Sequence, residues 1–132
     1  MYNLLGCILL MVGEMGKGSF PIDIQFVLKE FDNDVVFITE LFDAFFESVE
    51  KKIPYMERAA IDKDDKVLEP EAHAIKGGAA NIGANLLSKA AFDLMETCKV
   101  NRVDQYRENL EKIKKEFFKL KNYVEKHDDL MP

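Results

Sequence analysis

The sequence predicts an all-α protein: an antiparallel, up-and-down four-helix bundle with a short extra N-terminal helix. From residue 20 onward there is no Asn-Gly or Asp-Gly hairpin signal and no sustained alternation of apolar and polar residues. Apolar residues recur instead at steps of three and four, which places them on one face of a helix. Short polar turns separate these patterns, and short turns join antiparallel neighbours in bundles.

Composition narrows the functional classes. The chain has 132 residues, of which 48% are hydrophobic, and this suits one domain with an ordinary core. Its net charge is −6 and it has no block of five or more consecutive cations, so we expect no nucleic-acid binding. Two cysteines, Cys7 and Cys98, and two histidines without a Cys-x-x-Cys pair predict neither a disulfide framework nor a metal site. We therefore expect a cytoplasmic protein.

The N-terminal residues 1–19 form an extension to the bundle predicted at residues 20–127, and residues 128–132 form a tail. The extension contains an apolar run, Leu4–Val12, which is far shorter than the ~20 residues of a membrane-spanning helix. It also lacks the leading cations of a secretory signal. We interpret it as an apolar turn that packs on the domain or on another protomer, and we expect no membrane insertion. A glycine-rich hinge at residues 13–19 joins it to the bundle.

The first two helices follow from caps and spacing. Pro21 suits a first helical turn, and the cluster Asp32-Asn33-Asp34 ends this short helix and offers an N-cap for the next. The next helix is predicted over residues 34–60, with Pro54 as a candidate kink. Its apolar stripe has a near-heptad spacing and consists of Ile38, Phe42, Phe45, Val49, Ile53 and Met56, widened by Leu41 and Phe46.

Three more helices complete the bundle. The acidic stretch at residues 62–65 has neither the glycine nor the spacing of a calcium loop, so we interpret it as a turn with capping carboxylates. A third helix then ends near residues 81–83, with a core face of Leu68, Ala72, Ile75, Ala79 and Ile82. A fourth carries Leu87, Ala91, Leu94 and Cys98 on one face. The last has the cleanest stripe: Val103, Tyr106, Leu110, Ile113, Phe117, Leu120 and Val124.

The third helix carries the candidate chemistry. His73 lies roughly 140° from the centre of the core face, so its imidazole is predicted to face water. A neutral imidazole has one ring nitrogen with a free lone pair and can act as a nucleophile. Gly77 and Gly78 follow, although each glycine costs a helix roughly 1 kcal/mol relative to alanine. Their missing side chains would let a partner approach the ring, while Lys76 offers an ammonium group to an anion placed on it.

The segment His73–Ala84, HAIKGGAANIGA, resembles the H-x-L-K-G-[SA]-[SA]-x-x-x-G-[AL] signature of histidine-containing phosphotransfer (HPt) domains. Residues 23–46 and 87–96 are also similar to that family. The resemblance implies that His73 is the phosphoryl acceptor, that Lys76 stabilises the phosphoryl group and that Gly77 gives clearance. The departures are Ile75 in place of the usual leucine, Gly78 where serine is common, and an unmatched N-terminal extension.

The resemblance implies a phosphoryl carrier in a multistep phosphorelay, without autonomous kinase activity. A receiver-domain aspartate would pass its phosphoryl group to His73, which would pass it to a second receiver. The implied partners are response-regulator receiver domains and a hybrid sensor histidine kinase. No cofactor is expected on this chain, because Mg²⁺ would sit on the receiver.

The docking surface is predicted on the outer face of the third helix, with the partner-binding candidates Glu69, Gly78, Ala80 and Ala84. Glu69 is either a hydrogen-bond partner of the second ring nitrogen or a solvated acid. Net charge changes from −8 over residues 20–72 to +2 over residues 73–132, so the site lies near a change of sign. That pattern either orients a receiver or only favours solubility.

Two other functions compete with the carrier. One is a helical-bundle adaptor that binds receiver or kinase domains without being phosphorylated. The other is a metal-dependent enzyme, which we discount because a di-iron bundle needs inward-facing Glu-x-x-His pairs and Pro70 lies three residues before His73. His127 is not followed by a lysine and glycines as His73 is, and it is interpreted as a solvated tail residue.

Overall fold

The computed structural model describes residues 22–129, and the side chains of residues 22–124. The predicted extension at residues 1–19, the end of the predicted tail and the side chain of His127 lie outside this part of the chain. The described residues form helices α2 (Ile24–Glu30), α3 (Val35–Ile61), α4 (Asp65–Asn81), α5 (Asn85–Lys99) and α6 (Tyr106–Asp129), with a 3-10 turn, η1 (Val103–Gln105), before α6. None of them is a strand, and the predicted all-α class is confirmed.

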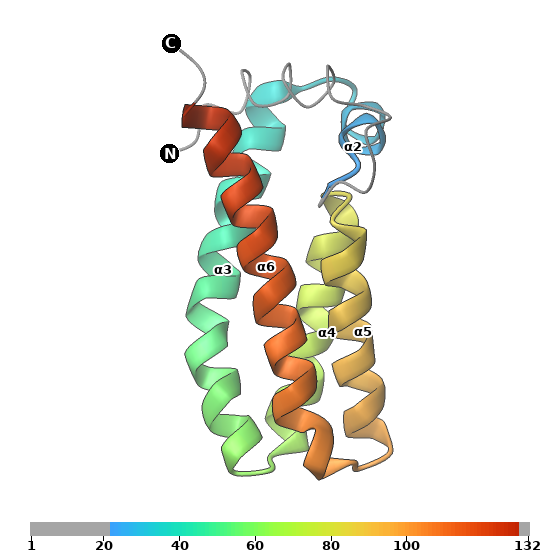
Figure 1. Ribbon diagram of the computed structural model, residues 1–132. Coiled ribbons are helices and arrows are strands. Elements are labelled where there is room, and N and C mark those ends of the chain that lie inside the picture. The colour runs from blue at the N-terminus through green and yellow to red at the C-terminus, as the bar shows by residue number, and fades with distance from the viewer. Residues whose placement is uncertain (1–21, 130–132) are drawn as a thin grey trace.

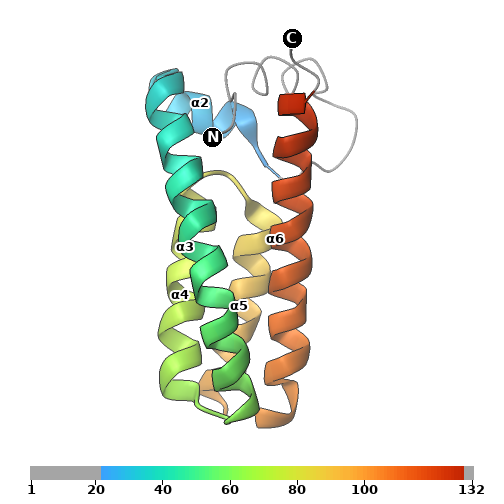
Figure 2. The same cartoon turned by 90° about the vertical axis from the view of Figure 1, so that its left-hand side faces the viewer.

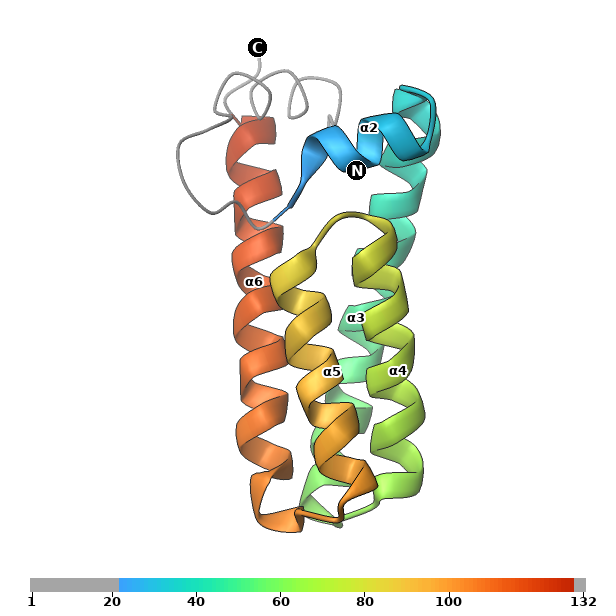
Figure 3. The same cartoon turned by 90° about the vertical axis from the view of Figure 1, so that its right-hand side faces the viewer.

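The four long helices run alternately up and down, and α2 lies across one end of the bundle (Figure 1). Turned views show that α3 and α6 extend beyond the turn between α4 and α5, and that α2 covers this turn (Figures 2 and 3). α4 packs most extensively against α5. The predicted bundle with a short helix as a lid is therefore confirmed.

Helix caps fix the beginnings of α2 and α3. The Asp23 carboxylate accepts the backbone N–H of Phe26, and the Asp34 carboxylate accepts that of Phe37, both at 3.1 Å. Asp34 belongs to the cluster predicted to provide the N-cap of α3, so that prediction is confirmed. Asp23 is the N-cap of α2, which begins at Ile24, and Pro21, predicted in the first turn of this helix, lies outside the described residues. Asp64 occupies the N-cap position of α4, but its side chain makes no capping hydrogen bond, so the predicted capping by this carboxylate is wrong.

The core is a single cluster along the bundle axis. Every predicted core residue of α4 and α5 is buried, and so is the α6 stripe from Tyr106 to Val124. Val103 is the exception in the last stripe: it is 39% exposed because the chain there forms the 3-10 turn, in which the α-helical spacing does not yet apply. On α3, Phe45 is only partly buried and packs at the edge of the core, so its predicted core position is corrected.

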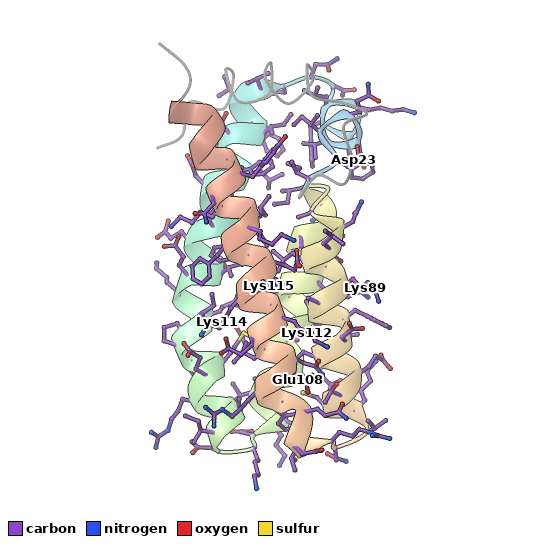
Figure 4. All side chains as sticks on the ribbon, in the orientation of Figure 1. Asp23, Lys89, Glu108, Lys112, Lys114 and Lys115 are labelled. Carbon is purple, nitrogen blue, oxygen red and sulfur yellow. The ribbon has the colours of Figure 1, made fainter. Side chains whose placement is uncertain are left out.

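The turn between α4 and α5 holds α2 in place. Gly83 has φ +71°, a left-handed conformation that glycine adopts at little cost. Its carbonyl accepts the backbone N–H of Asp23 at 2.8 Å. Figure 4 shows Asp23 beside this turn. A Cβ on residue 83 would lie 2.7 Å from the Asp23 carbonyl oxygen, so α2 can approach only because residue 83 has no side chain.

Candidate functional site

α4 presents its two faces to different surroundings. Leu68, Ala72, Ile75 and Ala79 point into the bundle and are at most 1% exposed. His73 is exposed on the opposite side, as its position relative to this stripe predicts. The packing of the stripe therefore fixes the direction of the imidazole toward solvent.

An open groove of about 580 Å³ lies beside the imidazole, between α4 and α5. Within the described residues, His73 makes no hydrogen bond or ion pair, so none of these residues engages its ring nitrogens. Glu69 lines the same groove, but no hydrogen bond joins it to His73, so of the two alternatives for Glu69 the contact to the second ring nitrogen is not formed. The groove is lined by Glu69, Pro70, His73 and Lys76 of α4 and by Phe92, Met95, Glu96 and Lys99 of α5.

Lys76 places a cation in this groove. Its Nζ atom lies 5.3 Å from the centroid of the Phe92 ring, which is a cation–π distance. No carboxylate among the described residues forms an ion pair with Lys76, although both Glu69 and Glu96 line the groove. The ammonium group therefore remains available to an anion brought to His73.

The two adjacent glycines have different surroundings. A Cβ on Gly77 would meet no atom within 4 Å, so the surface one turn beyond His73 is open. A Cβ on Gly78 would lie 2.7 Å from the Phe45 ring of α3. The interpretation of the pair as clearance for a partner thus agrees with the geometry at Gly77, whereas Gly78 serves the packing of α3 against α4.

The other predicted partner-binding residues divide by burial. Ala80 is exposed on the same side of α4 as His73. Ala84, at the N-cap of α5, is fully buried in the hydrophobic core. The prediction that Ala84 forms part of the docking surface is therefore wrong.

Lysine side chains lie on α3, α5 and α6 of the bundle. Lys89 on α5 and Lys112 and Lys115 on α6 lie on the face shown in Figure 4 and belong to the cationic half of the chain. On α3 and α4, Lys52 pairs with Glu71 at 2.7 Å. Across the described residues, no group of three or more histidine, cysteine or acidic side chains is arranged to hold a metal ion.

Comparison with protein families identifies the class. The Hpt domain family model matches residues 40–128, which is more than half of the chain. The chain therefore belongs to the Hpt domain family, whose members carry phosphoryl groups on histidine in phosphorelays, and the predicted family is confirmed.

A solved structure supports the fold. The chain is similar to histidine-containing phosphotransfer protein B (HptB) from Pseudomonas aeruginosa PAO1, with a TM-score of 0.71 and 19% sequence identity over 86% of this chain and 100% of that one. A comparison with curated protein sequences finds no match. No helix in residues 22–129 is both long and apolar enough to cross a membrane.

Two residues that contact Lys76, Ser88 and Phe92, have no signal in the sequence. Ser88 and Phe92 lie on α5, outside the signature segment, and each meets Lys76 only through the packing of α5 against α4. A serine and an exposed phenylalanine four residues apart have no pattern that would mark them in the sequence.

Proposed function

We propose that His73 accepts a phosphoryl group from the aspartate of a receiver domain and passes it to the aspartate of another. The observation that carries this proposal is the exposed imidazole of His73, with open space at Gly77 and, in the adjoining groove, the Lys76 ammonium, which pairs with no carboxylate of residues 22–124. A nucleophile, a cation and room for a second protein are what a carrier must supply itself.

The chemical step uses few groups of this chain. The lone pair of one neutral ring nitrogen attacks the phosphorus of the aspartyl phosphate, an N–P bond forms, and the P–O bond to the aspartate breaks to release its carboxylate. The receiver supplies Mg²⁺. Lys76 stabilises the charge on the phosphoryl oxygens once the group is on His73. Reversal of the same step toward a second receiver completes the relay.

The docking surface in this proposal is the exposed side of α4 with its edge toward α3. Gly77 and Ala80 present little side chain, so a receiver can come close to His73. A largely apolar groove of about 350 Å³ between α3 and α4 adjoins them and is suited to apolar side chains of the partner. Its wall includes Phe45 and Gly78. The partners are receiver domains, one of them in a hybrid sensor histidine kinase.

The test is phosphotransfer from a phosphorylated receiver with Mg²⁺. We expect phosphate on the wild-type protein that is labile in acid and stable in base, and no phosphate on a His73→Gln variant of unchanged helicity. Label on neither protein would favour the adaptor that binds without being phosphorylated, and label on both would place the acceptor elsewhere. ATP and Mg²⁺ alone should label neither, because the carrier has no kinase activity of its own.

A further inference from the structure

Two side chains of α5 contact Lys76, one at its backbone and the other at its ammonium group. The Ser88 hydroxyl donates a hydrogen bond to the Lys76 backbone carbonyl at 3.0 Å, and the Phe92 ring lies 5.3 Å from the Lys76 ammonium nitrogen. Ser88 and Phe92 are four residues apart, so they lie on the same face of α5 one turn from each other. The lysine backbone and the lysine head group are thus both fixed relative to one neighbouring helix.

Two glutamates line the groove, but neither forms an ion pair with Lys76. Glu69 and Glu96 both line it, and Glu96 pairs instead with Lys99 at 3.4 Å. An ion pair with either glutamate would neutralise the ammonium group before a phosphoryl group arrived. An aromatic face attracts the cation without neutralising it, because the attraction comes from the ring quadrupole.

Core packing does not account for the position of Phe92, whose side chain is 41% exposed at the rim of the groove. Phenylalanines that build the interior, such as Phe42 and Phe117, are at most 1% exposed. The exposed ring of Phe92 instead lines the groove that contains His73 and Lys76, and it faces the Lys76 ammonium.

We infer that Phe92 is a positioning residue for phosphoryl transfer, which holds the Lys76 ammonium beside His73 and apart from the glutamates of the groove. The inference rests on the proposed function for the role of Lys76, whereas the contact itself can be measured in the free protein. Exposed cation–π pairs have modest strength, so loss of the ring should slow transfer by about 2- to 5-fold.

The kinetic test compares Phe92→Leu, which keeps an apolar side chain without the ring, with Phe92→Tyr, which keeps the ring. Single-turnover transfer from a phosphorylated receiver is measured over a range of receiver concentrations. We expect Phe92→Leu to lower the saturating rate about 2- to 5-fold while the half-saturating receiver concentration is unchanged, and Phe92→Tyr to match wild type. The matched control is Phe118→Leu on α6, since Phe118 has a similar exposure of 46% and does not line the groove.

Measuring Phe92→Leu in a protein that lacks the Lys76 ammonium distinguishes positioning of Lys76 from a general structural effect of the substitution. If Phe92 acts through Lys76, then Phe92→Leu should have no further effect in a Lys76→Met protein. An equal slowing in both backgrounds, or an unchanged rate in the wild-type background, would overturn the inference.

Nuclear magnetic resonance tests the contact independently of phosphorylation. The ring current of Phe92 should shift the side-chain resonances of Lys76 in the free protein, and Phe92→Leu should abolish that shift while Phe92→Tyr retains it. Unchanged Lys76 resonances in Phe92→Leu would refute the positioning contact. Absence of phosphate on wild-type His73 would instead refute the proposed function, so the two failures are distinguishable.

Discussion

The two faces of α4 share one helical backbone, but one face is buried in the core and the other is exposed to solvent. The inner face, Leu68, Ala72, Ile75 and Ala79, is closed by the other helices. The outer face presents His73, Gly77 and Ala80 to solvent. Burial of the inner face stabilises the packing of the helix, whereas the outer face adds little to stability and leaves an imidazole accessible. Substitutions on the two faces should therefore separate folding from phosphotransfer.

The largest effect on stability is expected on the inner face. Ile75→Ala removes a fully enclosed side chain and leaves a cavity, so the free energy of unfolding should fall by about 3 kcal/mol. Urea denaturation measures this fall. The outer-face control is His73→Gln, which should change the free energy of unfolding by no more than about 0.5 kcal/mol. Equal losses in the two variants would contradict the division of α4 into a packing face and a chemical face.

The adjacent glycines allow a sharper comparison. Glycine to alanine has the same intrinsic effect on the helix at positions 77 and 78, so that contribution cancels between the two variants. Gly78→Ala forces a methyl group against Phe45, and it should be less stable than Gly77→Ala by about 1–3 kcal/mol.

Denaturation of both variants, in the wild-type and in a Phe45→Ala background, measures this difference. Removal of the Phe45 ring should bring the two variants to equal stability. A difference that persists without the ring would show that Phe45 is not its cause.

The enclosed side of the α4–α5 pair also predicts a pH dependence. Burial raises the pKa of the Cys98 thiol to about 11 from an ordinary value of 9.0, and the carboxylates of Glu69 and Asp65 raise it as well. Below about pH 9 the thiol is neutral in both states and its full contribution to stability is present. Between about pH 9 and pH 11 only the unfolded chain loses this proton, so the free energy of unfolding should fall as the pH rises, by on the order of 2 kcal/mol.

Denaturation at a series of alkaline pH values tests this, with Cys98→Ala as the control. The control should keep a weaker dependence, because burial also raises the pKa of Tyr106. The same alkaline slope in both proteins would rule out Cys98 as the cause.

The sequence was sufficient for the features that repeat along a helix. The stripes on α4, α5 and α6 follow spacing alone, and the outward direction of His73 follows from its angle to one of them. The candidate site could be predicted from a short segment, because its histidine, its lysine and the first of its glycines are close together in the sequence.

Contacts between helices could not be predicted in the same way. The predicted surface position of Ala84 is wrong because helical spacing does not show how the chain continues through the turn at Gly83. Spacing cannot predict that Gly78 packs against Phe45, because the two residues are far apart in the sequence. The Phe92 contact was missed for the same reason, since an exposed aromatic residue on another helix has no local pattern.

The smallest effect on stability, and the most direct test of the outer face, is expected for Gly77→Gln. The side chain would enter open space and glutamine is a better helix former than glycine, so the free energy of unfolding should rise by about 0.5 kcal/mol. The same side chain would stand one turn beyond His73 and obstruct an approaching receiver, so we expect weaker receiver binding and slower transfer to His73.

Titration calorimetry with a receiver measures the binding, and urea denaturation measures the free energy of unfolding of the same variant. Gly77→Ala is the control, since it also adds helix stability but little bulk. A more stable protein that binds its receiver less well is the result that only an access role for Gly77 predicts, and unchanged binding by Gly77→Gln would refute that role.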